Sequence, residues 1–159
     1  MTPSQISLRP ATSDDRGLQY RAYAASHVHE FALAGWDEAQ FDAFLSMQFS
    51  IRERAYALQF PTAEYSIIMF DGEPAGQIIV DRSEKAISLT DIALLPEFQG
   101  KGIGSRLISD LQAEACDSGR MMILSVERSN TAAKRLYDRL GFVVVGESEF
   151  NLEMEWKPA

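Results

Sequence analysis

The chain has 159 residues and a formal net charge of −8 at pH 7. A chain of this length makes one domain and buries about two-thirds of the surface that it would expose when unfolded. The acidic charge argues against a nucleic-acid-binding surface, which needs a basic stripe to neutralise phosphates, and it attracts cationic ligands such as amines. We therefore expect a single domain over residues 1–159 that does not bind nucleic acid.

Cysteine and histidine usage gives no indication of a metal site. The single cysteine, Cys116, excludes an internal disulfide and a cysteine-based zinc site. His27 and His29 form a His-x-His pair for which the sequence offers no third ligand. We expect no metal.

The N-terminal segment lacks the basic residues and apolar core of a signal peptide. No stretch approaches the roughly 18 apolar residues that would span a bilayer. We therefore expect a soluble, cytoplasmic protein that does not contact a membrane.

In the first half of the chain, alternation of apolar residues predicts a short strand over 6–8. Helix-capping residues follow at Thr12 or Ser13 for a helix that runs to Ala25, and at Asp37, where Gln40 completes a capping box. The second helix ends before Pro61. Two further strands, over 65–70 and 76–80, flank an Asp-Gly turn that is typical of a hairpin.

The second half alternates strands and helices. We predict strands over 87–95, 122–126, 142–145 and 152–156, one helix from the glycine-rich stretch after Pro96 to Gly119, and one from Asn130 to Gly141. The whole order is β-α-α-β-β-β-α-β-α-β-β. It predicts an α/β (α+β) mixed sheet in which one strand-helix-strand unit makes a parallel pair.

A glycine loop joins the strand over 87–95 to the helix that follows it. Glycines stand at 100, 102 and 104, and Ser105 begins a helical pattern. The first turn of a helix leaves backbone N–H groups unsatisfied and favours negative charge, and glycines let phosphate oxygens approach the backbone. The spacing fits neither a P-loop nor a dinucleotide fingerprint. A phosphate or pyrophosphate of another kind is the expected ligand, with an ordinary strand-to-helix turn as the alternative.

The loop resembles the acyl-CoA pyrophosphate loop of the GCN5-related N-acetyltransferase (GNAT) superfamily. It matches the pattern Gln/Arg-x-x-Gly-x-Gly/Ala at Gln99, Gly102 and Gly104. A second stretch, LSVERSNTAAKRLYDRLGF (124–142), resembles the second cofactor motif of the family, Asn-x-x-Ala-x-x-x-Tyr-x-x-x-Gly-Phe. The two motifs stand in the expected order and separation. The resemblance covers about the last 70 residues well and the first 60 only by the order of elements.

This resemblance implies a GNAT-like acyl-CoA N-acyltransferase fold and acetyl-CoA as cosubstrate. It implies that the backbone of the strand before the loop, which splays from the next strand in the family, binds the thioester and the pantetheine arm. The implied cofactor-binding residues are Ile92, Ala93, Leu94, Gln99, Gly100, Lys101, Gly102, Ile103, Gly104, Ser105, Asn130, Ala133, Lys134 and Tyr137. A purely structural alternative makes Asn130 a helix cap and Tyr137 a core aromatic.

Two residues are candidates for proton transfer. The resemblance implies that Tyr137 lies beside the cofactor sulfur, where a phenol can protonate the leaving thiolate. Asp91 interrupts an apolar strand close to the expected thioester, so its carboxylate could take the proton of the amine directly or through water. Asp81 and Glu127 are rivals for that role, and water chains without a dedicated base are a further alternative.

The acceptor is expected to be the primary amine of a small molecule, attacked directly in a ternary complex. Aromatic residues around Trp36 could line the amine-binding site, and the carboxylates Asp37, Glu38 and Asp42 could bind the amine. Packing in a helix core explains the aromatic residues as well, and a solvated helix face explains the carboxylates as well. Alternatives are a protein or peptide N-acetyltransferase and a non-catalytic acyl-CoA-binding domain. The last strands, ending in LEMEW (152–156), could form a sheet edge that pairs with a second copy in a homodimer.

Overall fold

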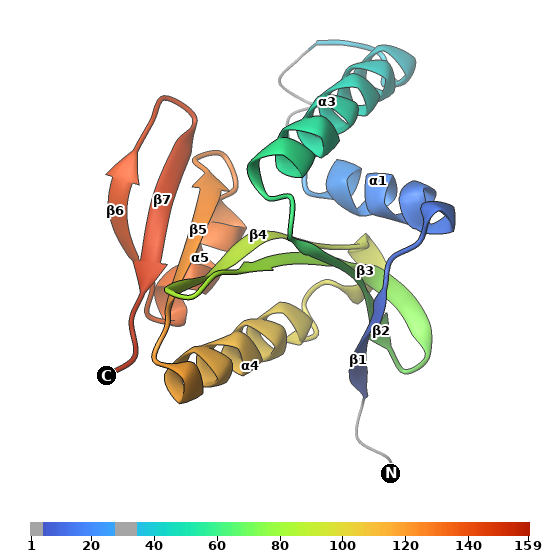
Figure 1. Cartoon of the computed structure of the whole chain (residues 1–159). Coiled ribbons are helices and arrows are strands. Elements are labelled where there is room, and N and C mark those ends of the chain that lie inside the picture. Colours follow the sequence, from blue (N-terminus) through green and yellow to red (C-terminus); the bar gives the residue numbers. More distant parts are fainter. Residues whose placement is uncertain (1–4, 28–34) are drawn as a thin grey trace. The chain divides into compact units, whose positions relative to one another are not determined.

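The structure is a computed structural model that describes residues 5–27 and 35–159. Its elements follow the predicted order (Figure 1): β1 (Ile6–Pro10), α1 (Arg16–Ala25), α3 (Glu38–Gln59), β2 (Glu64–Phe70), β3 (Glu73–Arg82), β4 (Ala86–Leu94), α4 (Ile103–Ser118), β5 (Met121–Glu127), α5 (Thr131–Arg139), β6 (Val143–Glu147) and β7 (Asn151–Trp156). Short 3-10 helices, η1 (Ser13–Asp15) and η2 (Pro96–Phe98), precede α1 and follow β4.

The seven strands are hydrogen-bonded in the order β1-β2-β3-β4-β5-β7-β6. β4 and β5 run parallel, whereas β7 pairs antiparallel with both β5 and β6. The predicted α/β mixed sheet and its parallel strand-helix-strand unit are therefore confirmed. The LEMEW strand, β7, is paired on both sides, so the outer strand at this end of the sheet is β6.

The chain divides into two compact units. The first contains the described residues up to Ile78 together with Ile92–Gln99, and the second contains Ile79–Asp91 together with Gly100–Ala159. β3 and β4 each pass from one unit into the other.

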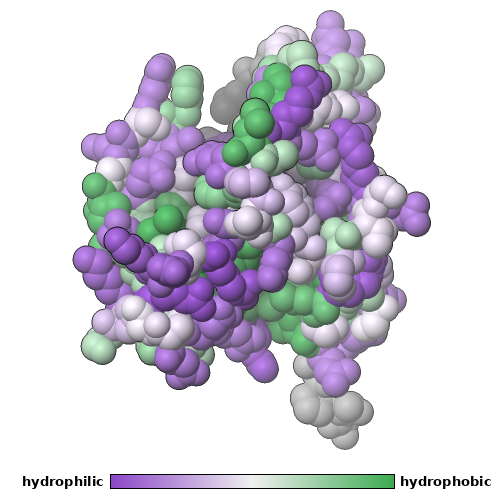
Figure 2. All heavy atoms as spheres, in the orientation of Figure 1, coloured by the Kyte–Doolittle hydropathy of each residue, from purple (hydrophilic) through white to green (hydrophobic). Residues whose placement is uncertain are grey.

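In the first unit, α1 and α3 lie side by side (Figure 1) and share a buried hydrophobic cluster. Tyr23, Phe41, Leu45 and Phe49 form this cluster. The predicted capping box is confirmed, since the Asp37 side chain accepts from the Gln40 N–H at 2.8 Å and the Gln40 side chain accepts from the Asp37 N–H at 3.0 Å. Hydrophobic residues also appear among hydrophilic ones in the region of α3 in Figure 2. Leu58, on this helix, is 85% exposed.

Local differences from the prediction arise at element ends. α4 begins at Ile103, two residues before Ser105, because Gly102 takes the left-handed conformation that caps the helix. β3 begins at Glu73, three residues earlier than predicted, because Asp71 and Gly72, both with positive φ, make the whole turn. β6 begins at Val143 because the Phe142 N–H still donates to the Tyr137 carbonyl at 3.0 Å and closes α5.

In the second unit, α4 packs on β5, and an ion-pair cluster joins the end of β3 to the last turns of α4. Arg82 donates to both carboxylate oxygens of Glu114, at 2.6 and 3.0 Å, and Arg120 adds a third contact at 3.1 Å. Arg82 thus fixes the strand to the helix that carries the glycine loop at its other end.

Candidate functional site

At two positions, the loop between β4 and α4 takes the left-handed conformation, which only glycine adopts without strain. Gly100 has φ +75° and Gly102 has φ +79°. Gly102 is the N-cap of α4 and lacks a side chain to bond the first helical N–H groups. Apart from its chain neighbours, a Cβ atom placed on either glycine would meet no atom of residues 5–27 and 35–159 within 4 Å. The described residues therefore leave open the space next to the α-carbons of these two glycines.

The first turn of α4 offers backbone donors at this place. The first intrahelical bond runs from the Arg106 N–H to the Gly102 carbonyl at 3.1 Å, so the N–H groups of Ile103, Gly104 and Ser105 precede the helical ladder. The first turn contains no acidic side chain. Ile103 is 1% exposed, so its side chain anchors the turn in the core and only its backbone can face a ligand. These groups fit a phosphate or pyrophosphate.

The residues before the loop lie in the first unit, where β3 holds the end of β4 tightly. A Cβ atom on Gly76 would overlap the Ala93 carbonyl oxygen, so only glycine allows the two strands to approach this closely. The Leu95 N–H donates to the Ala75 carbonyl at 2.8 Å. Gln99 donates from Nε2 to the Leu94 carbonyl at 3.1 Å, so its side chain holds the loop to the end of β4.

Asp91 stands where β4 has left its parallel neighbour. The ladder pairs Ala86 with Met121 and ends with Leu89 opposite Leu124, although both strands continue. Within the second unit, Thr90 and Asp91 therefore extend β4 beyond its pairing with β5. Such a divergence is what the resemblance implies for this strand, and Asp91 is half-buried there.

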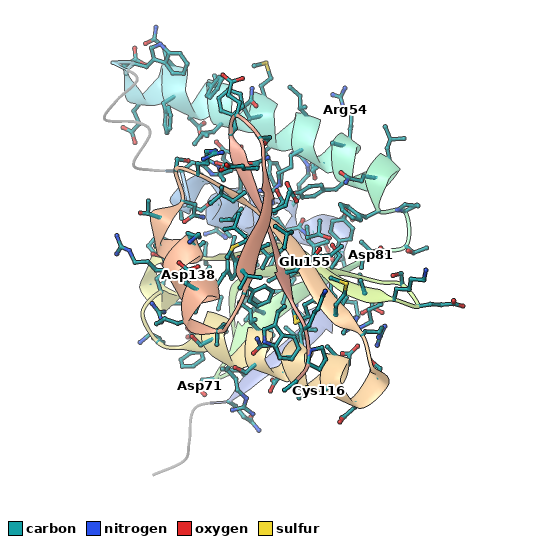
Figure 3. The ribbon with its side chains drawn as sticks, turned by 90° about the vertical axis from the view of Figure 1, so that its left-hand side faces the viewer. Arg54, Asp71, Asp81, Cys116, Asp138 and Glu155 are labelled. Carbon is teal, nitrogen blue, oxygen red and sulfur yellow. The ribbon has the colours of Figure 1, made fainter. Side chains whose placement is uncertain are left out.

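Helix α5 carries the second motif. Asn130 is its N-cap and accepts from the Ala133 N–H at 3.2 Å, so Asn130 does cap the helix. Lys134 forms an ion pair with Asp138 at 2.7 Å, and Asp138 is labelled on α5 in Figure 3. Tyr137 is 6% exposed, and its ring centroid is 5.8 Å from that of Phe142.

One residue that sequence patterns did not single out connects the two motifs. Gln112, in the middle of α4, donates from Nε2 to the Leu140 carbonyl at the end of α5, at 2.8 Å. This bond fixes the helix that begins at the glycine loop against the helix that carries Tyr137. An isolated glutamine on a helix face has no distinctive sequence signal.

The other candidate residues have separate surroundings. Asp81 is half-buried at the end of β3, and Glu127 is exposed at the end of β5. Asp42 accepts from the Tyr20 hydroxyl at 2.6 Å; burial and this carboxylate raise the pKa of Tyr20 to about 12. Trp36 is 41% exposed and packs on Phe44 at 5.0 Å between ring centroids.

His29 lies outside the described residues, while His27 is buried and its Nδ1 is 2.9 Å from the Tyr23 carbonyl. Within residues 5–27 and 35–159, no group of three or more His, Cys, Asp or Glu residues is arranged to hold a metal ion. In the same residues, no helix combines the length and apolar character that a membrane span requires.

Comparison with known proteins identifies the family. Residues 25–142, which include both motifs, match the acetyltransferase (GNAT) family. This chain belongs to the GNAT family. The predicted acetyl-CoA-dependent N-acetyltransferase class is thereby confirmed.

Individual relatives of this GNAT protein agree with the assignment. An uncharacterized N-acetyltransferase of Mycobacterium tuberculosis is 26% identical over 133 residues, which are 82% of this chain and 77% of that protein. The L-amino acid N-acyltransferase MnaT of Escherichia coli is 43% identical over 53 residues, 33% of this chain and 31% of that protein. The crystal structure of PaiA N-acetyltransferase from Thermoplasma acidophilum in complex with coenzyme A has the same fold, with a TM-score of 0.71, 19% identity and coverage of 97% and 99% of the two chains.

Proposed function

We propose that this GNAT protein transfers an acetyl group from acetyl-CoA to the primary amine of a small molecule, by direct attack in a ternary complex. The observation that carries the proposal is the glycine-capped start of α4, where open space lies above Gly100 and Gly102 and backbone donors precede the helical ladder. A pyrophosphate is the group that such donors suit best, because it accepts several N–H bonds at once and gains from the helix dipole.

The residues of the loop and of the neighbouring elements contact different parts of acetyl-CoA. Gly100, Gly102 and Gly104 let the pyrophosphate approach the backbone, and the N–H groups of Ile103 and Ser105 donate to it. Lys101 adds a positive charge at the exposed rim. The backbone of Ile92, Ala93 and Leu94 is the proposed contact of the pantetheine arm, and Asn130, Ala133 and Lys134 contribute from α5.

The chemical step needs a neutral amine, a stabilised carbonyl oxygen and a proton for the departing sulfur. The amine nitrogen attacks the thioester carbon, the new C–N bond forms as the C–S bond breaks, and the sulfur takes the phenolic proton of Tyr137. The cationic amine loses one proton to solvent before it attacks, and Asp91 takes the second proton, which the nitrogen loses as the amide forms, directly or through water. The Tyr137 ring packs on Phe142, which holds the phenol in a fixed place.

The net charge of −8 supports a cationic amine as the acceptor because it raises the local concentration of cations around the protein. The partial similarity to an L-amino acid N-acyltransferase supports a small molecule. Asp37 caps α3 and Asp42 accepts from Tyr20, so both carboxylates have partners within the protein.

The first experiment is calorimetry with acetyl-CoA, CoA and ATP. Binding of acetyl-CoA and CoA without ATP is expected, because the loop lacks the spacing of a nucleotide-binding P-loop. Absence of acetyl-CoA binding would refute the proposal. Thiol release is then measured with a panel of amino acids, polyamines and peptides, and release with peptides alone would replace the small-molecule acceptor by a protein one.

A further inference from the structure

Thr90 stands at a distinctive position in the second unit. It is the first residue of β4 beyond the ladder with β5, which ends where Leu89 lies opposite Leu124. Side chains alternate along a strand, so Thr90 shares a face with Ser88 and not with Leu89. This position places a hydroxyl where the two strands cease to pair.

The Thr90 hydroxyl is buried without a hydrogen bond. Its Oγ1 atom has no partner among the described residues, and it is the one buried side-chain oxygen or nitrogen there of which this is true. Buried polar groups in folded proteins are nearly always hydrogen-bonded, since leaving one unpaired costs its desolvation. An unpaired hydroxyl at this place therefore calls for a partner that the described residues do not supply.

The neighbouring strand is not that partner. Ser125 would follow as the residue opposite Thr90 if the ladder continued, but its hydroxyl donates to Glu153 Oε1 on β7 at 3.0 Å. Ser125 lies directly opposite Glu153 in the antiparallel β5–β7 pair, and this register directs the Ser125 hydroxyl toward β7. β5 thus has its polar group on the β7 side and leaves the Thr90 hydroxyl to another acceptor.

We propose that Thr90 Oγ1 donates a hydrogen bond to the acetyl carbonyl oxygen of bound acetyl-CoA. The inference rests on the proposed function, because it needs the thioester to lie beside the residues of β4 that extend beyond the ladder with β5. A hydroxyl donor suits this oxygen, which gains negative charge when the amine attacks the carbonyl carbon. Thr90 is then a catalytic residue that orients the acetyl group and stabilises the developing charge.

The acetyl group itself supplies the test. CoA has the same nucleotide and arm as acetyl-CoA but lacks the carbonyl, so a bond from Thr90 to that oxygen affects the two ligands differently. Thr90→Val keeps the branched shape and removes the hydroxyl. We expect it to weaken acetyl-CoA binding about tenfold in calorimetry while CoA binding stays within about twofold of wild type. Thr90→Ser, which keeps the hydroxyl, is expected to restore most of the acetyl-CoA affinity.

Two controls separate this role from a structural one. Ser88→Ala removes a buried hydroxyl on the same face of β4, inside the ladder, and is expected to leave the ratio of the two affinities unchanged. The melting temperature of Thr90→Val is expected to equal or exceed that of wild type, because no internal hydrogen bond is lost.

An equal loss for both ligands, an unchanged acetyl-CoA affinity or a lowered melting temperature of Thr90→Val would overturn the assignment of Thr90. Failure of the wild-type protein to bind either ligand would instead refute the proposed function, so the two failures are distinguishable.

Discussion

At the scale of single residues, Tyr137 combines burial with a polar group at its tip. Its side chain is 6% exposed and packs on Phe142, so removal of the hydroxyl alone should preserve the packing. We predict that Tyr137→Phe lowers kcat at least tenfold, the typical scale of general acid catalysis being about 100-fold or more, while the Kd for acetyl-CoA stays nearly constant. Steady-state thiol release and calorimetry measure the two quantities. An unaltered kcat would remove Tyr137 from the mechanism.

Asn130 has one role that its contacts define and another that the family motif implies. Its side chain caps α5 through the Ala133 N–H. Asn130→Ala should therefore lower the free energy of unfolding by about 1 kcal/mol, as loss of a cap does in other helices. Urea denaturation measures this cost.

Asn130→Asp separates the two roles because aspartate caps helices as well as asparagine does. If Asn130 also contacts the cofactor, the added negative charge weakens acetyl-CoA binding while stability stays near that of wild type. Unchanged affinity in Asn130→Asp would leave Asn130 as a cap alone.

At the scale of the element, α4 has a left-handed glycine at each end, Gly102 at the start and Gly119 at the C-cap. A Cβ on either meets no atom within 4 Å in the part of the chain that the structure describes, so a substitution at either position strains the backbone without a clash there. The two glycines therefore form a matched pair for testing the loop.

We predict that Gly102→Val weakens acetyl-CoA binding at least tenfold, because the branched side chain enters the space proposed for the pyrophosphate. Gly119→Val should lower the melting temperature to a similar degree, since both positions have comparable positive φ, and leave the affinity unchanged. Calorimetry and thermal melts on both variants check this. Equal acetyl-CoA affinity of Gly102→Val and wild type would show that the loop is an ordinary turn that does not bind the pyrophosphate.

At the scale of the whole molecule, the Arg82–Glu114–Arg120 cluster makes stability depend on pH. The hydrogen bond from Arg82, followed by the charges of both arginines, holds the pKa of Glu114 below its ordinary value of 4.5. A carboxyl with a lowered pKa stabilises the fold fully above its ordinary pKa, and this contribution is lost as the pH falls through the lowered pKa.

Glu114→Gln should therefore reduce the free energy of unfolding by about 1 kcal/mol at neutral pH, since the pair is partly exposed to solvent. The difference from wild type should shrink in acid, once Glu114 is protonated in the wild-type protein as well. Urea denaturation across the acid range measures this, with the exposed Glu84→Gln as control. A difference that is constant with pH would contradict the ionic origin.

The sheet edge also belongs to this scale. β6 is the outer strand, and Val143, Val144 and Val145 on it are each more than 40% exposed. An apolar edge strand is a natural site for pairing with another chain. Pairing with a second copy stays a prediction, which the mass in light scattering checks.

The sequence by itself determined the order of elements, because that order follows from local physics. Alternating apolar residues define strands, and the Asp37–Gln40 capping box and Gly119 define helix ends. Two short motifs, one at Gln99, Gly102 and Gly104 and one from Asn130 to Phe142, indicated the family. Each of these signals depends on residues close together in the chain.

Only the tertiary structure decided which distant residues meet. The close approach of Gly76 to Ala93, the bond from Gln112 to Leu140 and the end of the β4–β5 ladder before Thr90 all depend on contacts between separate elements. A glycine, a glutamine or a threonine looks ordinary in the sequence, because its partner, or the lack of one, is fixed by strand register and helix packing.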